Sequence, residues 1–312
     1  MSECNLISMS GGKDSTALAL LAIERNAENQ RFVFADTGHE HALTYEYLDY
    51  LEDRLDISIE RVQADFSQEI ENKRKTIVEK WPRDGVAQER IDSALIATTA
   101  TGNPMLDLSI WKGRFPSTRA RFCSQELKHR PLDQYTAGLL EQFDSVIGWQ
   151  GVRRDESLQR ANLIVEEDHP TIQGLTWYRP ILDWTADDCF AMHTRHGIKP
   201  NPLYRLGMAR VGCMPCIHSR KSELAEIAER FPDEIARVAN WEKRVGDASK
   251  RGVSIWYDAR ITARYTGIDE IKATTHGIYA AADWAKNRRQ GQSELFDETA
   301  PASCSSLYGL CE

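Results

Sequence analysis

Residues 5–15, with the sequence NLISMSGGKDS, decide the fold class of this chain. The first five of them form a short apolar run typical of a buried strand, and residues 14–24 form an apolar stretch of helical length. A serine and two glycines separate the two runs, and glycine permits the tight backbone turn that such a junction needs. A strand that leads through a glycine loop into a helix is typical of an open α/β sheet.

The same alternation continues towards the C-terminus and predicts an α/β fold with a doubly wound, Rossmann-like parallel sheet. Residues 66–135 are less regular and carry a Gly-Asn-Pro break at 102–104. The further expected elements are strands at 31–36, 57–62, 145–149 and 176–182 and a helix at 44–55.

From residue 221 the pattern changes to two amphipathic helices, expected at 222–230 and 233–244 around Phe231-Pro232. We therefore predict a division into residues 1–220, which carry the parallel sheet, and residues 221–312, a smaller helical C-terminal region. The last 25 or so residues are polar, and we expect a poorly structured tail that carries two cysteines.

Composition excludes several classes of protein. The chain has 312 residues, of which 41% are hydrophobic and 28% charged, and this argues against a disordered or collagenous chain. No apolar run approaches the roughly 18–20 residues of a membrane-spanning helix, and the N-terminus lacks the basic start of a signal peptide, so a cytoplasmic protein is expected. The net charge of −8 disfavours bulk electrostatic capture of nucleic acid.

The cysteine count points to metal binding or thiol chemistry. The chain has seven cysteines, an odd number, and the absence of a secretion signal argues against a disulfide framework. They are Cys4, Cys123, Cys189, Cys213, Cys216, Cys304 and Cys311.

The glycine loop has the chemistry of a phosphate cradle. Gly11 and Gly12 let the backbone approach an anion, and the following helix presents unpaired N–H groups. Lys13 adds a positive charge, while Ser10 and Ser15 add hydroxyls. The spacing is not that of a Walker A loop. A tight turn followed by a helix cap is the alternative, but it does not explain so particular a combination.

Asp36 ends the second predicted strand, where an open α/β sheet places its ligand crevice. We expect it to help bind a nucleoside. The alternative is a local turn cap, because Asp-Thr-Gly is a good turn sequence.

The loop SGGKDS resembles the pyrophosphate loop of the adenine nucleotide alpha-hydrolase, or N-type ATP pyrophosphatase, superfamily. The later motifs are similar to its phosphoadenosine phosphosulfate (PAPS) reductase family, in the family's order, over roughly residues 5–235. These motifs are FADTGHE at 34–40, Gly148 with VRRDES at 152–157 and Arg160, RPILDW at 179–184, and NPLY at 201–204.

The resemblance implies an enzyme with an adenine nucleotide, ATP or a phosphosulfate, as ligand in residues 1–220. It implies that Arg153 and Arg154 contact phosphate or sulfate and act in catalysis with Lys13 and Asp14, since guanidinium binds such anions bidentately. It also places Gly148 near the nucleotide, and Asp14 is the candidate contact for Mg²⁺ bound with ATP.

Two chemistries compete within that resemblance. Pyrophosphatase-type members act on the α-phosphate of ATP and couple it to sulfur transfer, whereas the reductases release sulfite from an adenylyl sulfate. A lysine in the loop is needed most when β- and γ-phosphates must be neutralised, so the intact SGGKDS favours the first. A non-catalytic nucleotide-binding partner protein is the third alternative.

The resemblance also implies an iron–sulfur cluster, of the 4Fe–4S type, held by Cys123, Cys213 and Cys216. Relatives with a cluster have a Cys-Cys pair where this chain has Phe122-Cys123. A fourth ligand would be Cys304 or Cys311, or one iron would be left open.

A CxxC such as 213–216 also fits zinc, with His218 or His129 completing the set, or a redox dithiol. The remaining two cysteines, Cys4 and Cys189, are expected to be small core residues.

Residues 112–130 concentrate positive charge in an otherwise acidic chain. The stretch has a single acid, Glu126, and it predicts either a solvated face or a rim for a polyanion such as a triphosphate or a nucleic-acid backbone. A sulfur-donor protein is the other expected partner. The basic residues are Lys112, Arg114, Arg119, Arg121, Lys128 and Arg130.

Overall fold

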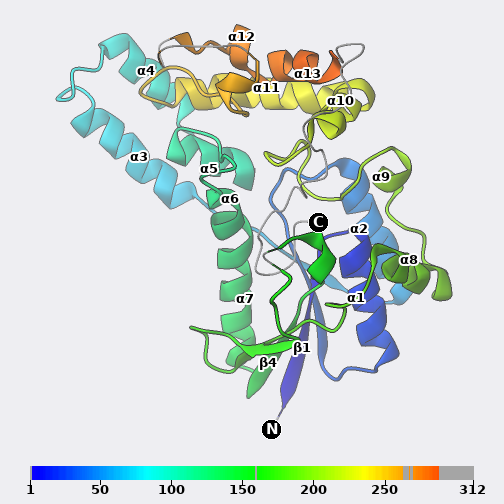
Figure 1. The fold of residues 1–312 in the computed structure, drawn as a ribbon. Helices are drawn as coiled ribbons and strands as arrows, with labels where there is room; N and C mark the ends of the chain where they lie inside the picture. The colour runs from blue at the N-terminus through cyan, green and yellow to red at the C-terminus, as the bar shows by residue number, and fades with distance from the viewer. Residues whose placement is uncertain (1, 159, 263–266, 268–269, 288–312) are drawn as a thin grey trace. The chain divides into compact units, whose positions relative to one another are not determined.

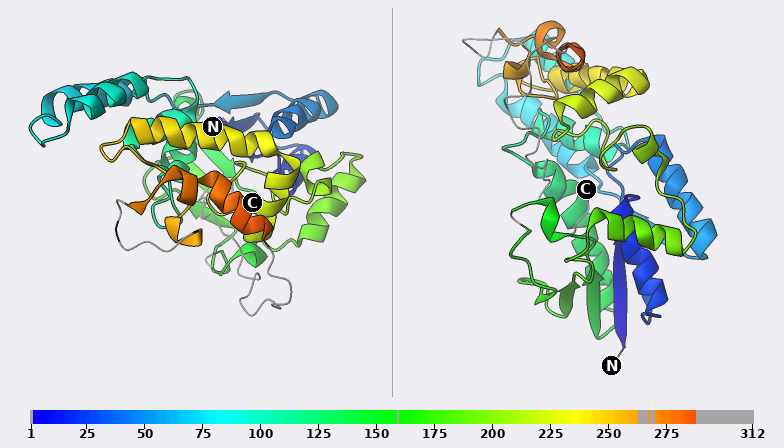
Figure 2. Two further views of the ribbon diagram at one scale, coloured as in Figure 1. Left: turned by 90° about the horizontal axis from the view of Figure 1, so that it is seen from above. Right: turned by 45° about the vertical axis from the view of Figure 1, so that its right-hand side comes forward.

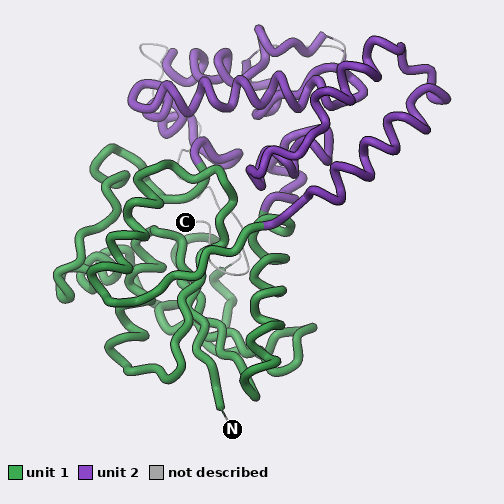
Figure 3. The backbone as a smooth tube through the Cα atoms, turned by 180° about the vertical axis from the view of Figure 1, so that it is seen from behind, with its two compact units in different colours: residues 1–63, 124–213, 299–312 green, residues 64–123, 214–298 purple. Residues whose placement is uncertain are grey.

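The computed structural model describes residues 2–158, 160–262, 267 and 270–287 (Figure 1). The chain divides into two compact units (Figure 3). Unit 1 takes in Met1–Gln63 and Ser124–Cys213, and unit 2 takes in Ala64–Cys123 and Met214–Glu298. The units therefore alternate along the chain, instead of meeting once near residue 220. The predicted tail with Cys304 and Cys311 lies outside the described residues.

Unit 1 is built on a six-stranded sheet with the order β3-β2-β1-β4-β6-β5. All neighbours are parallel except β5, which pairs antiparallel with β6. This confirms the predicted α/β fold with a mostly parallel sheet. The strands are β1 (Glu3–Met9), β2 (Gln30–Ala35), β3 (Ile59–Val62), β4 (Ser145–Trp149), β5 (Glu166–Asp168) and β6 (Leu175–Tyr178).

The central strands are buried on both faces, as the continuous apolar runs indicate. Helices α1, α2 and α8 cover one face of the sheet and α7 covers the other (Figures 1 and 2). Alternate residues of β1 point to opposite sides: Ile7 and Met9 pack with α1, α2 and α8, whereas Cys4 and Leu6 pack with α7. This layering leaves the strand ends and their loops to form the site. The helices are α1 (Lys13–Glu24), α2 (Ala42–Leu55), α7 (Arg130–Leu140) and α8 (Ala186–Arg195).

Unit 2 is helical. Residues 67–112, which the sequence led us to expect as irregular, hold three helices, and that expectation was wrong. The pattern is weak because these helices are mostly polar: α3 buries only Ile70 and Ile77 in its 14 residues. The helices are α3 (Ser67–Lys80), α4 (Gln88–Ala97), α5 (Pro104–Lys112), α10 (Lys221–Arg230), α11 (Pro232–Asp247), α12 (Ala273–His276) and α13 (Ile278–Lys286).

Short elements complete the two units. They are α6 (Phe122–Ser124), the π-helix η1 (Gln125–His129), the 3₁₀ helices η2 (Arg154–Glu156) and η3 (Ala259–Ile261), and α9 (Pro202–Arg205). Within the described part of the chain, no helix is both long and apolar enough to span a membrane.

Candidate functional site

The glycine loop of unit 1 leaves the carboxyl end of β1 and turns directly into α1. Gly11 has a φ of +76°, a left-handed conformation that glycine adopts without strain. A Cβ at this position would lie 2.9 Å from Cγ2 of Thr44, so the loop is also closely packed against α2. The carbonyl of Gly11 accepts a hydrogen bond of 3.0 Å from Nδ2 of Asn201. The loop is therefore held in one conformation from two sides.

The two serine hydroxyls of the loop bond to the loop itself. The backbone N–H of Ser10 donates to Oγ of Ser15 at 3.1 Å, and the two hydroxyl oxygens lie 2.9 Å apart. The N–H of Gly12 donates to Oγ of Ser10 at 3.3 Å, and Oγ of Ser15 donates to the Gly12 carbonyl at 3.2 Å. These bonds close the turn, and the N-cap residue of α1, Gly12, has no side chain that could cap the helix.

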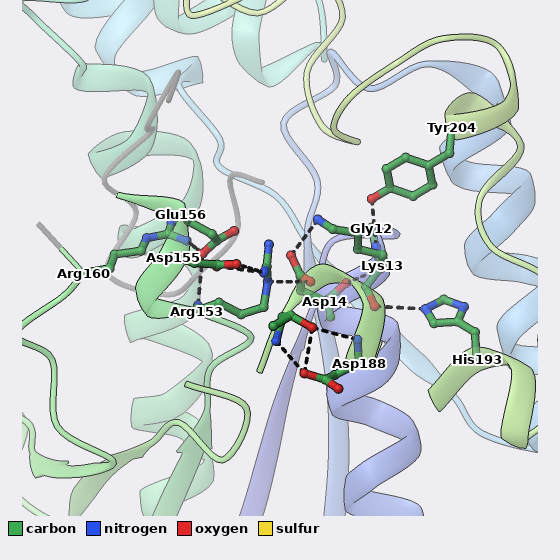
Figure 4. Close-up of polar contacts among 12 residues, drawn as sticks. Gly12, Lys13, Asp14, Arg153, Asp155, Glu156, Arg160, Asp188, His193 and Tyr204 are labelled. Atoms are coloured by element: carbon green, nitrogen blue, oxygen red, sulfur yellow. Dashed lines mark hydrogen bonds and ion pairs between the residues drawn. The ribbon is translucent and has the colours of Figure 1, made fainter. Parts of the chain in front are cut away.

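Two residues that sequence analysis did not single out hold the first residue of α1 (Figure 4). The N–H of Lys13 donates to the Tyr204 hydroxyl at 2.9 Å, and Nε2 of His193 lies 2.9 Å from the Lys13 carbonyl. Burial lowers the pKa of His193, so the ring is neutral at pH 7 and donates through Nε2. Tyr204 belongs to the quoted NPLY motif, whereas His193 has no signal in the sequence.

The charged centre of the site joins three of the predicted catalytic residues. Nζ of Lys13 lies 2.9 Å from Oδ2 of Asp14, and Nε of Arg153 lies 3.0 Å from Oδ1 of the same carboxylate (Figure 4). Asp14 is fully buried, and Lys13 and Arg153 are 8% and 5% exposed. Two cations therefore converge on one carboxylate at the N-terminus of α1, where the helix dipole also favours negative charge.

The loop after β4 brings Arg153 to this centre. Nη1 of Arg153 contacts both carboxylate oxygens of Asp155 at 2.7 Å, and its backbone N–H donates to Oε2 of Glu156 at 3.0 Å. Arg160 pairs with the same Glu156 carboxylate. Gly151 passes so close to α1 that a Cβ there would lie 3.3 Å from the backbone nitrogen of Ser15. Sequence analysis missed Gly151, which allows this approach.

The structure gives Arg154 different partners from Arg153. Nε of Arg154 pairs with Oδ1 of Asp183 at 2.6 Å, and Nη1 donates to the carbonyls of Ala161 at 2.8 Å and Leu163 at 2.5 Å. These contacts fix the backbone of the segment that follows η2, at Ala161 and Leu163. The predicted role of Arg154 as an anion ligand stays a prediction.

Gly148 lies inside β4, next to β6. A Cβ there would be 3.4 Å from Cδ1 of Leu175 and 3.5 Å from Cδ1 of Trp177. The missing side chain thus serves close packing between strands. Its expected place near a nucleotide stays a prediction.

Asp36 caps the turn that follows β2. Its Oδ1 accepts from the N–H of Gly38 at 2.9 Å and from the hydroxyl of Tyr45 at 2.7 Å, and its Oδ2 accepts from Nε2 of Gln63 at 2.6 Å. The alternative interpretation as a turn cap is therefore present in the structure. A nucleoside contact is compatible with it, because the carboxylate lies at the predicted strand end.

Cys213 lies beside this turn. Its sulfur is 3.4 Å from Oγ1 of Thr37 and 3.7 Å from Oε1 of Glu40, and Glu40 and Cys213 form an isolated antiparallel bridge. Burial raises the pKa of Glu40, an effect that the nearby Lys128 charge partly opposes. The thiol of Cys213 thus lies between the Glu40 carboxyl group and the Thr37 hydroxyl group.

The other two predicted cluster cysteines, Cys123 and Cys216, belong to unit 2. The backbone N–H of His218 lies 3.5 Å from the Cys216 sulfur, and the Cys216 carbonyl accepts from the Tyr257 hydroxyl at 2.9 Å. Across the described ranges, no three Cys, His, Asp or Glu side chains are arranged to hold a metal ion. The described residues therefore do not by themselves assemble a cluster or zinc site.

The two cysteines expected in the core are there. Cys4 and Cys189 are fully buried, on opposite faces of the sheet. The basic residues of 112–130 fall in both units, because the division lies at residue 123.

The chain belongs to the phosphoadenosine phosphosulfate reductase domain family, whose model matches residues 5–219. This matches the family that the motifs of the sequence resemble. An uncharacterized 37.8 kDa protein of Escherichia phage 186 is 53% identical over 100% of this chain and 97% of its own length.

Relatives with a stated activity match over shorter regions. Adenosine 5'-phosphosulfate reductases of Neisseria meningitidis serogroup A and Streptomyces coelicolor are 34% and 38% identical over 36% and 30% of this chain. Those regions cover 44% and 37% of the two reductases, less than half of each. A solved PAPS reductase from Candida auris aligns at 16% identity over 67% of this chain and 80% of its own, with a TM-score of 0.42, and the family assignment does not depend on it.

Proposed function

We propose that unit 1 binds an adenine nucleotide at the loop of residues 10–15 and acts at the α-phosphate of ATP, with the activated product used for sulfur transfer. In this reaction an acceptor oxygen forms a bond to the α-phosphorus, and the bond to the β-phosphate bridging oxygen breaks. Pyrophosphate leaves with the electron pair. The family assignment supports the nucleotide, and the charged centre supports the choice of ATP.

The convergence of Lys13 and Arg153 on Asp14 is the observation that carries this proposal. Both cations are almost fully buried, and burial strengthens their electrostatic interaction with a bound anion. A triphosphate brings more negative charge than one carboxylate, so Lys13 would turn to the β- and γ-phosphates and Arg153 would contact the α-phosphate. Fixed cations of this kind stabilise charge that develops on the leaving pyrophosphate.

The loop backbone supplies the second part of the binding site. The left-handed turn at Gly11 and the serine hydrogen bonds fix the start of α1 before the ligand arrives, so little ordering is required on binding. The Tyr204 hydroxyl occupies the position from which a phosphate oxygen would accept a hydrogen bond from the Lys13 backbone N–H. This hydroxyl would therefore be displaced by the ligand or would donate to it.

Two cofactors belong to this proposal. Mg²⁺ would enter with ATP, and Asp14 is the loop carboxylate nearest to the lysine that would contact the phosphates. The cysteines predicted to bind an iron–sulfur cluster do not form a set of three ligands in the described residues, so no step is assigned to a cluster.

Sulfite release from adenylyl sulfate is the second candidate, because two relatives carry the name adenosine 5'-phosphosulfate reductase. One experiment separates the two. Protein purified without oxygen is incubated with ATP and Mg²⁺ and assayed for pyrophosphate, and in parallel with adenylyl or phosphoadenylyl sulfate and thioredoxin and assayed for sulfite.

We expect pyrophosphate from the native chain and none from Lys13→Ala. The matched control is Lys199→Ala, an exposed lysine of unit 1. Sulfite in the second assay with no pyrophosphate in the first would overturn the proposal in favour of the reductase. Tight ATP binding with neither product would favour a nucleotide-binding partner protein.

A further inference from the structure

Unit 2 contains a pocket of about 700 Å³ between α3, α5 and the segment that follows α11. This volume lies within the range of small-molecule sites, roughly 300–1,000 Å³, and far exceeds the need of one phosphate ion. Positive charge dominates the wall, since five basic side chains face one carboxylate. The charged lining residues are Lys73, Lys112, Arg114, Lys250, Arg251 and Glu69.

Lys73 is a half-buried cation of the pocket. Its Nζ donates to the carbonyl of Ile110, and in the described part of the chain no carboxylate forms an ion pair with it. Burial lowers the pKa of Lys73 to about 8, with no acidic group acting in the opposite direction. An ammonium group in this position lacks a counter-ion, and a bound anion would supply one.

The other cations of the wall either lie over aromatic rings or are exposed to solvent. Nζ of Lys112 lies 3.5 Å from the centre of the Trp111 ring, and the Arg114 guanidinium lies 5.7 Å from that of Phe122. Arg251 is exposed. These side chains therefore present positive charge that carboxylates only partly offset.

Two acids reduce the positive charge of the wall. Lys250 pairs with Asp84 at 2.6 Å, and Glu69 is itself part of the lining. Lys73, Lys112, Arg114 and Arg251 still outnumber Glu69 after that pair is set aside.

The uncharged part of the wall includes apolar side chains such as Trp81, Val253 and Ile255, together with polar ones such as Asn72, Thr76 and Ser249. Trp111 stacks on Phe66 with ring centres 5.7 Å apart and carries Lys112 as well, so this ring holds a cation rather than offering a free face. The pocket thus suits a ligand with a strongly anionic end and a flat or apolar body. A nucleotide has this combination and this size.

We propose that this pocket of unit 2 binds a nucleotide through its phosphate groups, either a free nucleotide or one nucleotide of a single-stranded nucleic acid. The site is separate from the glycine loop of unit 1, and it does not depend on the reaction proposed there. It uses Lys112 and Arg114, two of the six basic residues that the sequence concentrates at 112–130.

Binding is tested by calorimetric titration with ATP and, separately, with a ten-nucleotide single strand at low salt. Lys73→Met keeps most of the length of the side chain and removes its charge. We expect about tenfold weaker binding of at least one ligand to this variant, the loss of one charge-assisted contact. Lys75→Met is the matched control, because Lys75 is exposed on the same helix and does not line the pocket, and it should bind as the native chain does.

Arg251→Gln provides a second test in case Lys73→Met does not fold, with the exposed Lys243 of α11 changed to glutamine as its control. The same test is repeated in a chain that carries Lys13→Ala. If Lys73→Met still weakens binding in that chain, the site is distinct from the loop of unit 1. If Lys73→Met weakens the binding of ATP, the ligand of the pocket is a free nucleotide. If it weakens only the binding of the oligonucleotide, the ligand is a nucleotide of a single strand. Native affinity of both ligands for Lys73→Met and Arg251→Gln would overturn the proposal.

Discussion

The Arg153 guanidinium and the Asp14 carboxylate, far apart in the sequence, form a buried ion pair with Nε 3.0 Å from Oδ1. Asp14 also pairs with its neighbour Lys13, so two cations share one buried carboxylate. The pair therefore connects the loop after β1 to the loop after β4. Removing the Asp14 carboxylate would take one ion-pair partner from both buried cations, although Arg153 would keep Asp155.

Asp14→Asn should destabilise unit 1 and make it depend on nucleotide. Removing one member of a buried ion pair costs about 3–5 kcal/mol, because the two buried cations then lose the carboxylate that they share. ATP added without Mg²⁺, the ion for which Asp14 is the candidate contact, would supply the missing negative charge, so the rise in melting temperature on adding it should be larger for this variant than for the native chain. Thermal unfolding with and without ATP measures both effects.

Asp183→Asn is the control for that experiment, since Asp183 pairs with Arg154 but is exposed, and such a pair contributes at most about 1 kcal/mol. Equal ATP-induced shifts in the native chain and in Asp14→Asn would contradict a phosphate site at this centre.

Arg153→Gln should reduce pyrophosphate formation by about a hundredfold or more, because a fixed cation beside the reacting phosphate contributes roughly 3 kcal/mol to transition-state stabilisation. The effect should fall mainly on kcat. Arg153→Lys should recover only part of the activity, since a lysine loses the planar fork that contacts two groups at once. Initial rates over a range of ATP concentrations give both constants, and a change confined to KM would argue against a role in the reaction.

The sheet was predictable because parallel strands that are buried on both faces have sequences that form short, continuous apolar runs. The helices of residues 67–112 were not, because most of their side chains face solvent and the apolar positions are few. The loop cations were also predictable as types of residue. Their convergence on Asp14 depends on a loop from a distant strand, and no local pattern encodes that distance.

Gly11→Ala should destabilise the chain through two separable effects. One is the left-handed φ of +76°, which costs an alanine roughly 1–2 kcal/mol. The other is the contact of 2.9 Å that a Cβ would make with Cγ2 of Thr44. Urea unfolding should therefore show a loss of about 2–4 kcal/mol.

Gly197→Ala isolates the first effect, because Gly197 has a φ of +64° and no atom within 4 Å of the added Cβ. It should cost less than Gly11→Ala. Thr44→Ser removes the contacting methyl group, so the double variant Gly11→Ala with Thr44→Ser should regain part of the lost stability. Equal losses for the two glycine variants would show that the packing against Thr44 is unimportant.

The site was predictable only where a motif marks it. Tyr204 belongs to the NPLY motif, yet His193 touches the same residue of the loop and has no neighbours in the sequence that mark it. A buried histidine on a helix looks like any core residue until the fold brings it to the Lys13 carbonyl. Gly151 is similar, because its importance follows from the approach of two backbones.

Glu242 in unit 2 should make stability depend on pH. It is 4% exposed, and its carboxylate accepts from the backbone N–H of Trp256 at 2.7 Å and of Ile278 at 3.0 Å. Burial raises the pKa of Glu242 to about 7, and these two hydrogen bonds oppose the rise only in part. An acid whose pKa is higher in the folded state binds its proton more tightly there. Its contribution is thus complete below about pH 4.5 and is lost as the pH rises through about 7.

Glu242→Gln tests this directly, because the amide keeps an acceptor oxygen and cannot ionise. The free energy of unfolding of the native chain, relative to that of Glu242→Gln, should fall by up to about 3 kcal/mol between pH 5 and pH 8, measured by urea unfolding at each pH. The exposed Glu229 of α10, changed to glutamine, is the control and should show no such difference. If the gap between the native chain and Glu242→Gln is the same at both pH values, the carboxyl group is not protonated in the folded state, and the two backbone hydrogen bonds outweigh its burial.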